Sequence, residues 1–201
     1  MWKWFKKKED KSTIMEEESE DRERTFRERM EVGKRILALL AVIGKVHDDN
    51  PQFNNWFERN KIEEYLSEKE RTLWQSENPS KEELIKFSWR AEALTSLLWA
   101  AKMIENMPGL NKQYNVFSNP KVLEILKNPE SFLNTIELRN EKEIEEMEEE
   151  LYEQHWRVRD AQLFKKPMPN ELAPSIVYER RYGLSWIVGW GEDWDHVPTD
   201  T

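Results

Sequence analysis

Four segments of the chain place charged side chains among tryptophan and aliphatic residues, and these are residues 87–99, 155–161, 178–186 and 194–201. Charged side chains are almost never fully buried unless they are paired. Charges in such surroundings therefore belong either to a buried polar network or to a functional site. The pattern alone leaves both interpretations open.

Glu92 is the charge that most needs a partner, because it lies between Ser88 and Ser96 at four-residue spacing on an otherwise apolar segment. Arginine is the best partner, since a guanidinium can bind a carboxylate through two hydrogen bonds. We expect Arg159 and Arg180 to be the arginines that touch Glu92, Asp160 or Glu179. The available arginines are Arg90, Arg157, Arg159, Arg180 and Arg181. The whole set predicted to meet in one buried or half-buried network is Glu92, His155, Arg157, Arg159, Asp160, Glu179, Arg180 and Asp195.

The same residue types are compatible with a metal site, since Glu92, His155, Asp160 and Glu179 offer carboxylates and an imidazole from several helices. Di-metal sites in helical bundles use Glu-x-x-His pairs, however, and the residue three before His155 is Tyr152. The sequence contains no zinc-protease, phosphate-loop, serine-hydrolase or dinucleotide-binding motif. We therefore assign no metal, no cofactor and no catalytic residue.

These residues lie on elements that read as helices throughout, because apolar residues recur at helical spacing and no strand-like alternation persists. The sequence predicts an all-α fold, a single compact domain of about seven or eight helices around a central apolar helix at about 80–106. We expect the domain to cover residues 16–201, preceded by a flexible basic and aromatic tail at 1–15. The expected helices are 16–46, 53–60, 67–75, 80–106, 119–127, 129–138, 140–164 and 174–188.

Read in order, the four charged segments resemble the motifs of the bacterial domain-of-unknown-function family 4272. The resemblance runs from about Arg29 to Thr201 and includes the final Trp-Asp and Thr-Asp-Thr elements. It implies a single compact bacterial domain. It implies no activity, since none is assigned to the family.

Residues 137–153 carry nine acidic and two basic residues, so this segment holds −7 of the chain's formal charge of −9. Its apolar stripe faces inward, which would leave the glutamates outside. A solvated helix face and an acidic docking surface for a basic protein both fit the pattern. The candidate binding residues are Glu145, Glu148 and Glu149, and the stripe is Ile144, Met147, Leu151, His155 and Val158. Such a surface would repel phosphates, so we expect no nucleic-acid partner.

The remaining features concern the cellular compartment, contact with membranes and the C-terminal tryptophans. The chain has no cysteine, which favours a reducing compartment, and its longest apolar run of eight residues is too short to cross a bilayer. We expect a cytoplasmic protein without a signal peptide. The first eight residues, with four lysines and three aromatic residues, suit weak contact with an anionic membrane surface or a solvated tail. Trp186, Trp190 and Trp194 are expected to close the core as a lid.

Two functional hypotheses follow from these observations. The first is a non-catalytic protein-binding domain, an immunity or antitoxin-like inhibitor of a bacterial toxin, because the chain is small, acidic and free of reaction motifs. The alternative is an enzyme or a small-ligand or metal-binding protein that uses the Glu/His/Arg/Asp cluster between helices.

Overall fold

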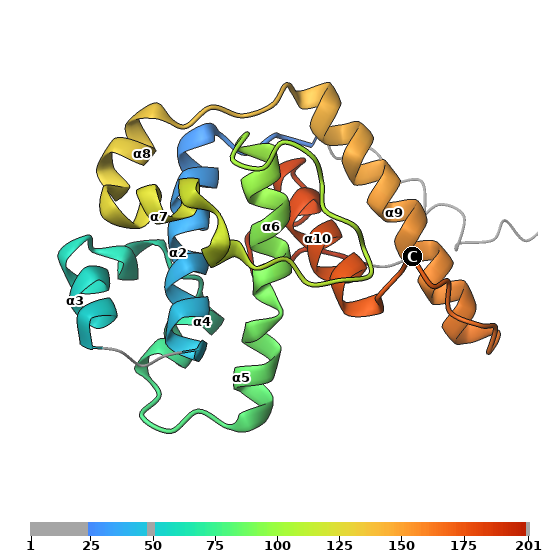
Figure 1. The fold of residues 1–201 in the computed structure, drawn as a ribbon, viewed down its shortest axis with the longest axis horizontal. Coiled ribbons are helices and arrows are strands. Elements are labelled where there is room, and N and C mark those ends of the chain that lie inside the picture. Colours follow the sequence, from blue (N-terminus) through green and yellow to red (C-terminus); the bar gives the residue numbers. More distant parts are fainter. Residues whose placement is uncertain (1–23, 48–50, 200–201) are drawn as a thin grey trace, which may run out of the picture.

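The computed structural model describes residues 24–47 and 51–199, which form nine α-helices and two short 3-10 helices and contain no strand (Figure 1). The all-α expectation is confirmed. The helices are α2 (Arg29–His47), α3 (Pro51–Arg59), η1 (Ile62–Tyr65), α4 (Glu68–Gln75), α5 (Lys81–Ser88), α6 (Arg90–Ala100), η2 (Val116–Ser118), α7 (Pro120–Lys127), α8 (Pro129–Thr135), α9 (Glu141–Leu163) and α10 (Pro174–Ile187).

The core is built around α2 and α6, which pack against each other, with α10 on the other side of α6 (Figure 1). Every residue of α2 from Ile36 to Ile43 is buried. This burial follows from its neighbours, because α2 is in contact with α3, α4, α5, α6 and α8. A helix that is apolar on all sides is stable only when other elements cover all of those sides.

The central helix predicted at 80–106 is two helices, α5 and α6, and it ends earlier than expected, at Ala100. The interruption at Trp89 is slight, since this residue keeps right-handed helical angles of φ −66° and ψ −21°. The early end is stabilised both locally and from a distance, and the local part is the Met103 N–H, which donates to the Leu98 carbonyl at 2.8 Å. Arg139 donates its backbone N–H to the Ala100 carbonyl at 2.8 Å and its Nε to the Trp99 carbonyl at 2.8 Å. Lys102 then turns the chain away with a left-handed φ of 57°.

Side-chain caps fix the starts of most other helices where the sequence predicted them. Ser67 with Glu70 and Ser80 with Glu83 both form reciprocal capping boxes at the starts of α4 and α5. Asn119 and Asn128 cap α7 and α8, each directly before a proline in the first turn. These local signals explain why the predicted and observed bounds of these helices agree closely.

Within the described residues, the helix predicted at 16–46 is helical only from Arg29 onward. Residues 24–28 form no helix, and the Arg27 backbone N–H donates to the carbonyl of Ile187 at the end of α10 at 2.9 Å. Gly189, with a φ of +90°, allows this approach, since a Cβ at that position would lie 2.5 Å from the Thr25 carbonyl oxygen. The predicted tail at 1–15 and the predicted helical residues 16–23 lie outside the described residues.

Helix α9 lies along one edge of the domain and packs mainly on α10 (Figure 1). Its inward stripe consists of Ile144, Glu148, Leu151, His155 and Val158. One side of this 23-residue helix is therefore covered and the other is open. Among the helices of the described chain, none combines the length and apolar character needed to cross a membrane.

Candidate functional site

Three consecutive charged residues of α10, Glu179, Arg180 and Arg181, are buried and reach three different neighbours. The side chains of successive residues in an α-helix point about 100° apart, so the side chains of one short segment can contact several neighbouring elements. The predicted polar residues therefore meet α10 in separate groups rather than in one network.

The Glu92–Arg180 pair joins α6 to α10 in the deepest part of the domain. Arg180 donates Nε to Glu92 Oε2 at 2.9 Å, and its NH2 lies 2.8 Å from the same oxygen. The two side chains are 0% and 1% exposed. The other Glu92 oxygen accepts the backbone N–H of Tyr114 at 3.0 Å, and Arg180 NH1 donates to the carbonyls of Pro108 and Gly109. The pair thus fixes the connection between α6 and η2 as well as the two helices.

The Arg90–Glu179 pair joins the start of α6 to α10 at a distance of 3.0 Å between NH1 and Oε2. Burial raises the pKa of Glu179, while the nearby Arg90 guanidinium acts to lower it. Arg90 also lies over the ring of Tyr182, 4.1 Å from its centroid. Such a cation–π contact stabilises a buried guanidinium on the side that has no carboxylate.

The third group joins α9 to α10 through Arg181. Its NH1 lies 2.8 Å from His155 Nδ1 and its Nε lies 3.8 Å from Glu148 Oε1. Ser185 donates its hydroxyl to the same Glu148 oxygen at 2.7 Å. Burial, together with the positive charges of Arg181 and Arg159, lowers the pKa of His155 to about 4. The imidazole is therefore neutral near pH 7.

The other predicted members of the network lie outside it, and the expectation of a single network is wrong. Arg157 pairs with Glu171 at 2.6 Å and Asp160 with Lys166 at 2.7 Å, both near the surface. Arg159 is exposed and touches neither Glu92 nor Glu179. All three lie near the end of α9: Arg157 and Asp160 pair with residues near the surface, and Arg159 lines a pocket beside α10.

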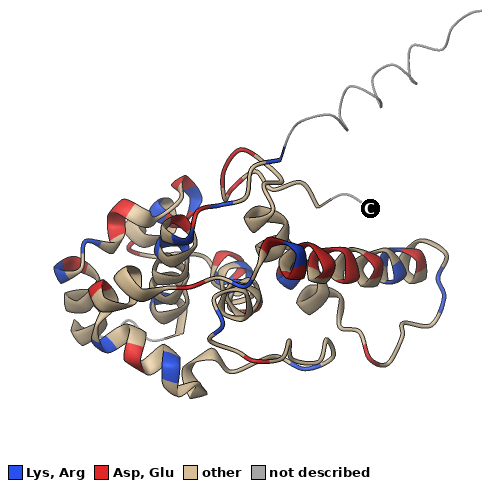
Figure 2. Cartoon of the chain, turned by 90° about the horizontal axis from the view of Figure 1, so that it is seen from above, with Lys and Arg blue, Asp and Glu red and all other residues tan. Residues whose placement is uncertain are grey.

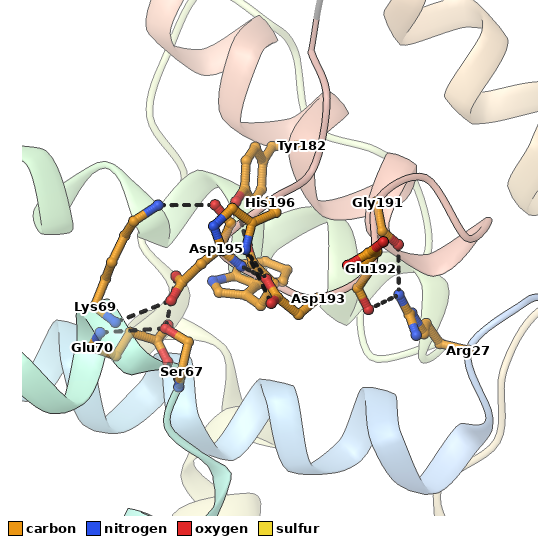
Figure 3. Close-up of polar contacts among 11 residues, drawn as sticks. Arg27, Ser67, Lys69, Glu70, Tyr182, Gly191, Glu192, Asp193, Asp195 and His196 are labelled. Carbon is orange, nitrogen blue, oxygen red and sulfur yellow. Dashed lines mark hydrogen bonds and ion pairs between the residues drawn. The ribbon is translucent and has the colours of Figure 1, made fainter. Parts of the chain in front are cut away.

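Asp195 belongs to a different contact, between the C-terminal segment and the start of α4 (Figure 3). Its carboxylate accepts the Ser67 hydroxyl at 2.9 Å and the Lys69 backbone N–H at 3.0 Å, instead of the arginine expected from the sequence. Carboxylates are stabilised there because the first N–H groups of a helix lack partners. The neighbouring Trp194 is buried against Tyr182 and Trp186, as the lid interpretation predicted.

Trp190, the third tryptophan of the expected lid, is 37% exposed. Nearby, Arg27 donates NH2 to the carbonyls of Gly191 and Glu192 at 3.0 and 3.1 Å (Figure 3). The C-terminal segment is thus fastened at two places, before α2 and at α4. Its polar groups serve to close the fold.

Sequence reasoning missed the buried Arg35–Glu70 pair, in which NH1 and Oε2 lie 2.7 Å apart. Glu70 also accepts the Ser67 backbone N–H, so its capping role was visible in the sequence while its second role was not. A usable signal was Arg35, which directly precedes the apolar run starting at Ile36. A charge at that position of a buried helix requires a partner.

The acidic segment is divided by its position on α9. Glu145 and Glu149 are exposed, as predicted, and Figure 2 shows acidic residues along much of the helix. Glu148 was predicted to lie outside, and this is wrong: it is buried against Arg181 and Ser185. The spacing contained the reason, since Glu148 follows Ile144 by four residues and precedes Leu151 by three.

The exposed side of α9 also presents aromatic side chains. Tyr152 and Trp156 are exposed, and Trp156 keeps 54% of its surface open. Glu145, Glu149, Tyr152 and Trp156 follow one another at intervals of four, three and four residues, so they form one row. We call these residues, with Glu153 beside them, the α9 outer face.

Metal ligands do not gather within residues 24–47 and 51–199, where no group of three or more His, Cys, Asp or Glu side chains is placed to hold an ion. The four residues considered for a metal have other partners. Glu92 pairs with Arg180, Glu179 with Arg90 and Asp160 with Lys166, and His155 is hydrogen-bonded to Arg181.

The fold and these contacts define a class of protein: a helical domain whose buried charges connect its helices and whose edge helix exposes an acidic and aromatic face. The chain belongs to the family Domain of unknown function (DUF4272), whose model matches residues 8–197. The match starts earlier than the expected Arg29 and includes part of the predicted tail, and it ends at residue 197, before the final Thr-Asp-Thr element that the resemblance included. No curated protein and no solved structure matches the chain.

Proposed function

We propose that this protein is a non-catalytic, cytoplasmic protein-binding domain that docks a basic protein on the α9 outer face. The observation that carries the proposal is the row of exposed acidic and aromatic side chains on a helix that packs mainly on α10. A helix face that is already covered by the rest of the protein cannot dock a partner. This face is open along most of its length.

The charge of the face supports a basic partner. The exposed acids of α9 are Glu141, Glu145, Glu146, Glu149, Glu150 and Glu153. They have few local counter-charges, since Lys142 approaches Glu146 only to 3.7 Å. Charges this dense steer an oppositely charged protein within the screening length of about 8 Å at physiological salt. The same field would repel the phosphates of nucleic acids.

The exposed aromatic side chains support a protein partner rather than a solvated surface. Tryptophan and tyrosine are enriched among the residues that contribute most to binding, because they bury a large area with few rotatable bonds. Trp156 lies in the row of Glu145 and Glu149. An acidic rim beside an aromatic anchor is the composition expected of a docking surface.

A partner of the toxin class fits this surface, with the protein acting as an immunity or antitoxin-like inhibitor. An inhibitor needs a complementary surface and no reaction centre, and a cationic toxin would complement the α9 outer face. The small size and acidic character of the chain suit that role.

The test is affinity capture from the native host with three versions of the chain: wild type, the Glu145→Lys, Glu149→Lys variant, and a control with Glu58→Lys and Glu64→Lys. The control makes the same change of charge at exposed positions of α3 and η1. Glu148 is left unchanged because it is buried. We expect a basic protein that the wild type and the control retain and the α9 variant loses. Equal retention by all three would place the interface elsewhere.

The inhibitor role has a separate test. The captured protein should stop growth when it is expressed alone, and co-expression with the wild-type chain should restore growth. Co-expression with the Glu145→Lys, Glu149→Lys variant should not restore it. A captured protein that is harmless alone would exclude the toxin while leaving the docking surface in place.

A further inference from the structure

A pocket of about 290 Å³ opens where α9, α10 and the α5–α6 junction meet, beside the Arg90–Glu179 pair. Its lining includes Lys86, Trp89, His155, Arg159 and Tyr178. We propose that this pocket binds a small organic anion that carries a flat ring. The proposal concerns a different surface from the α9 outer face and does not depend on it.

The cations of the pocket are available for such a ligand. Lys86 and Arg159 are exposed, and neither forms an ion pair with a carboxylate of residues 24–47 or 51–199. Glu179 also lines the pocket, but its carboxylate is bound by Arg90 at 3.0 Å. The pocket is therefore a positively charged place on a protein whose formal net charge is −9. An unpaired arginine offers several N–H donors to a carboxylate or phosphate.

His155 supplies a neutral donor. Arg181 NH1 lies 2.8 Å from His155 Nδ1, and because a guanidinium is always a donor, Nδ1 must accept. The ring proton of the neutral imidazole is then on Nε2. The lowered pKa of His155 agrees with a neutral ring. No described group bonds to Nε2, so its N–H is available to an oxygen of the ligand.

The rings of Trp89 and Tyr178 provide the apolar part of the pocket. Tyr178 is held edge-on to His155, with ring centroids 5.7 Å apart. Val158 adds an aliphatic side chain to this wall. A volume of about 290 Å³ is at the lower end of the range for ligand sites, which suits one ring and one acidic group.

The test is protein-observed NMR with matched probes: benzoate and phenyl phosphate as ring anions, benzyl alcohol as the neutral ring, benzylamine as the cation and acetate as the anion without a ring. At least one ring anion should shift the Trp89 indole N–H and the His155 ring signals at lower concentration than any of the other three. The preferred ring anion shows whether the acidic group is a carboxylate or a phosphate.

Two neighbouring arginines of α9 give a matched pair of variants. Arg159→Gln should weaken binding of the ring anion about 3- to 10-fold, since it removes a charged contact at a solvated site. Lys86→Gln should act in the same direction. Arg157→Gln should leave binding unchanged, because Arg157 pairs with Glu171 and does not line the pocket.

Three results would overturn the proposal. If benzyl alcohol bound with the same affinity as the ring anions, the pocket would be an apolar cleft that does not select for charge. Equal weakening by Arg157→Gln and Arg159→Gln would show a general effect of net charge. An absence of localised shifts with both ring anions would exclude the site.

Discussion

A buried carboxylate is stable when each of its oxygens has a fixed donor, and Glu92 meets this condition. Arg180 approaches one oxygen and the Tyr114 backbone N–H donates to the other. The charge thus connects two helices and a loop. Removing one member of such a pair leaves the other buried and uncompensated, which costs far more than the pair itself contributes.

The first prediction concerns this pair. Glu92→Ala should lower the free energy of unfolding by about 3 to 5 kcal/mol, because Arg180 would be left in an apolar interior. The exposed Glu82→Ala is the control and should change it by less than about 0.5 kcal/mol. Urea unfolding measures both. A small effect of Glu92→Ala would mean that water reaches Arg180. Replacing both members by methionine should recover only part of the loss: it removes the uncompensated charge, but the Tyr114 N–H and the Pro108 and Gly109 carbonyls lose their partners.

The second prediction is a pH dependence from His155. Its pKa is about 4 in the folded protein against an ordinary 6.5, so between these values the unfolded chain binds more protons. Stability carried by the neutral ring is therefore present above about pH 6.5 and is lost as the pH falls toward 4.

The measurement is unfolding at several pH values for wild type and His155→Asn. The wild type should lose about 1 to 3 kcal/mol more than the variant between pH 6.5 and 4. His196→Asn, at an exposed position, should behave like the wild type. Parallel curves for wild type and His155→Asn would contradict a buried neutral imidazole.

At the scale of the elements, the close approach of α6 and α10 depends on Gly183. A Cβ at this position would lie 2.3 Å from Ser96 Oγ and 2.8 Å from the Ala93 carbonyl oxygen. Contacts that short force the two helices apart. The same two helices carry the Glu92–Arg180 pair, so the glycine also sets the distance at which that pair forms.

The third prediction follows from this contact. Gly183→Ala should destabilise the protein by about 1 to 3 kcal/mol, measured by urea unfolding. Adding Ser96→Ala should recover only part of the loss, because the Ala93 carbonyl remains in the way. Gly109→Ala is the control, since its nearest atom would be 3.6 Å away. Equal effects of the two glycine changes would show that helix separation is not the cause.

The sequence predicted the elements well where the signal was local. The capping boxes at Ser67 and Ser80 and the Asn-Pro starts at 119 and 128 gave bounds close to the observed ones. The end of α6 was not predictable, because a lysine, Lys102, takes the left-handed conformation that glycine usually takes, and Arg139 caps the helix from 40 residues away. Helix ends determined by distant groups leave no local pattern.

The charged residues were predicted in the same partial way. Burial of Glu92 and the need for an arginine could be deduced from the apolar surroundings, and Arg180 fills that place. Which charged residues of α9 and α10 pair with each other could not be deduced, because the pairing depends on the angle at which α9 crosses α10. Glu148 illustrates the limit: it fits the apolar stripe by spacing, and its burial requires Arg181 and Ser185 from another helix.

At the scale of the whole molecule, charge is separated by place. Acidic residues are concentrated along α9 (Figure 2), and those on its exposed side are open to the solvent. Several arginines are held inside the fold by carboxylates and aromatic rings. A surface of one sign accelerates encounter with an oppositely charged protein and has less influence on dissociation. The proposed docking function therefore has a kinetic signature.

The most direct measurement of that claim is the rate of association between this protein and its captured basic partner at low and physiological salt. For the wild type the rate should fall as salt rises, and Glu145→Lys with Glu149→Lys should lower it about 10-fold or more at low salt. The Glu58→Lys, Glu64→Lys control carries the same net charge as the α9 variant, and its rate should stay within about 3-fold of the wild-type rate. Association that is insensitive to salt, or equally slowed in both variants, would contradict docking on the α9 outer face.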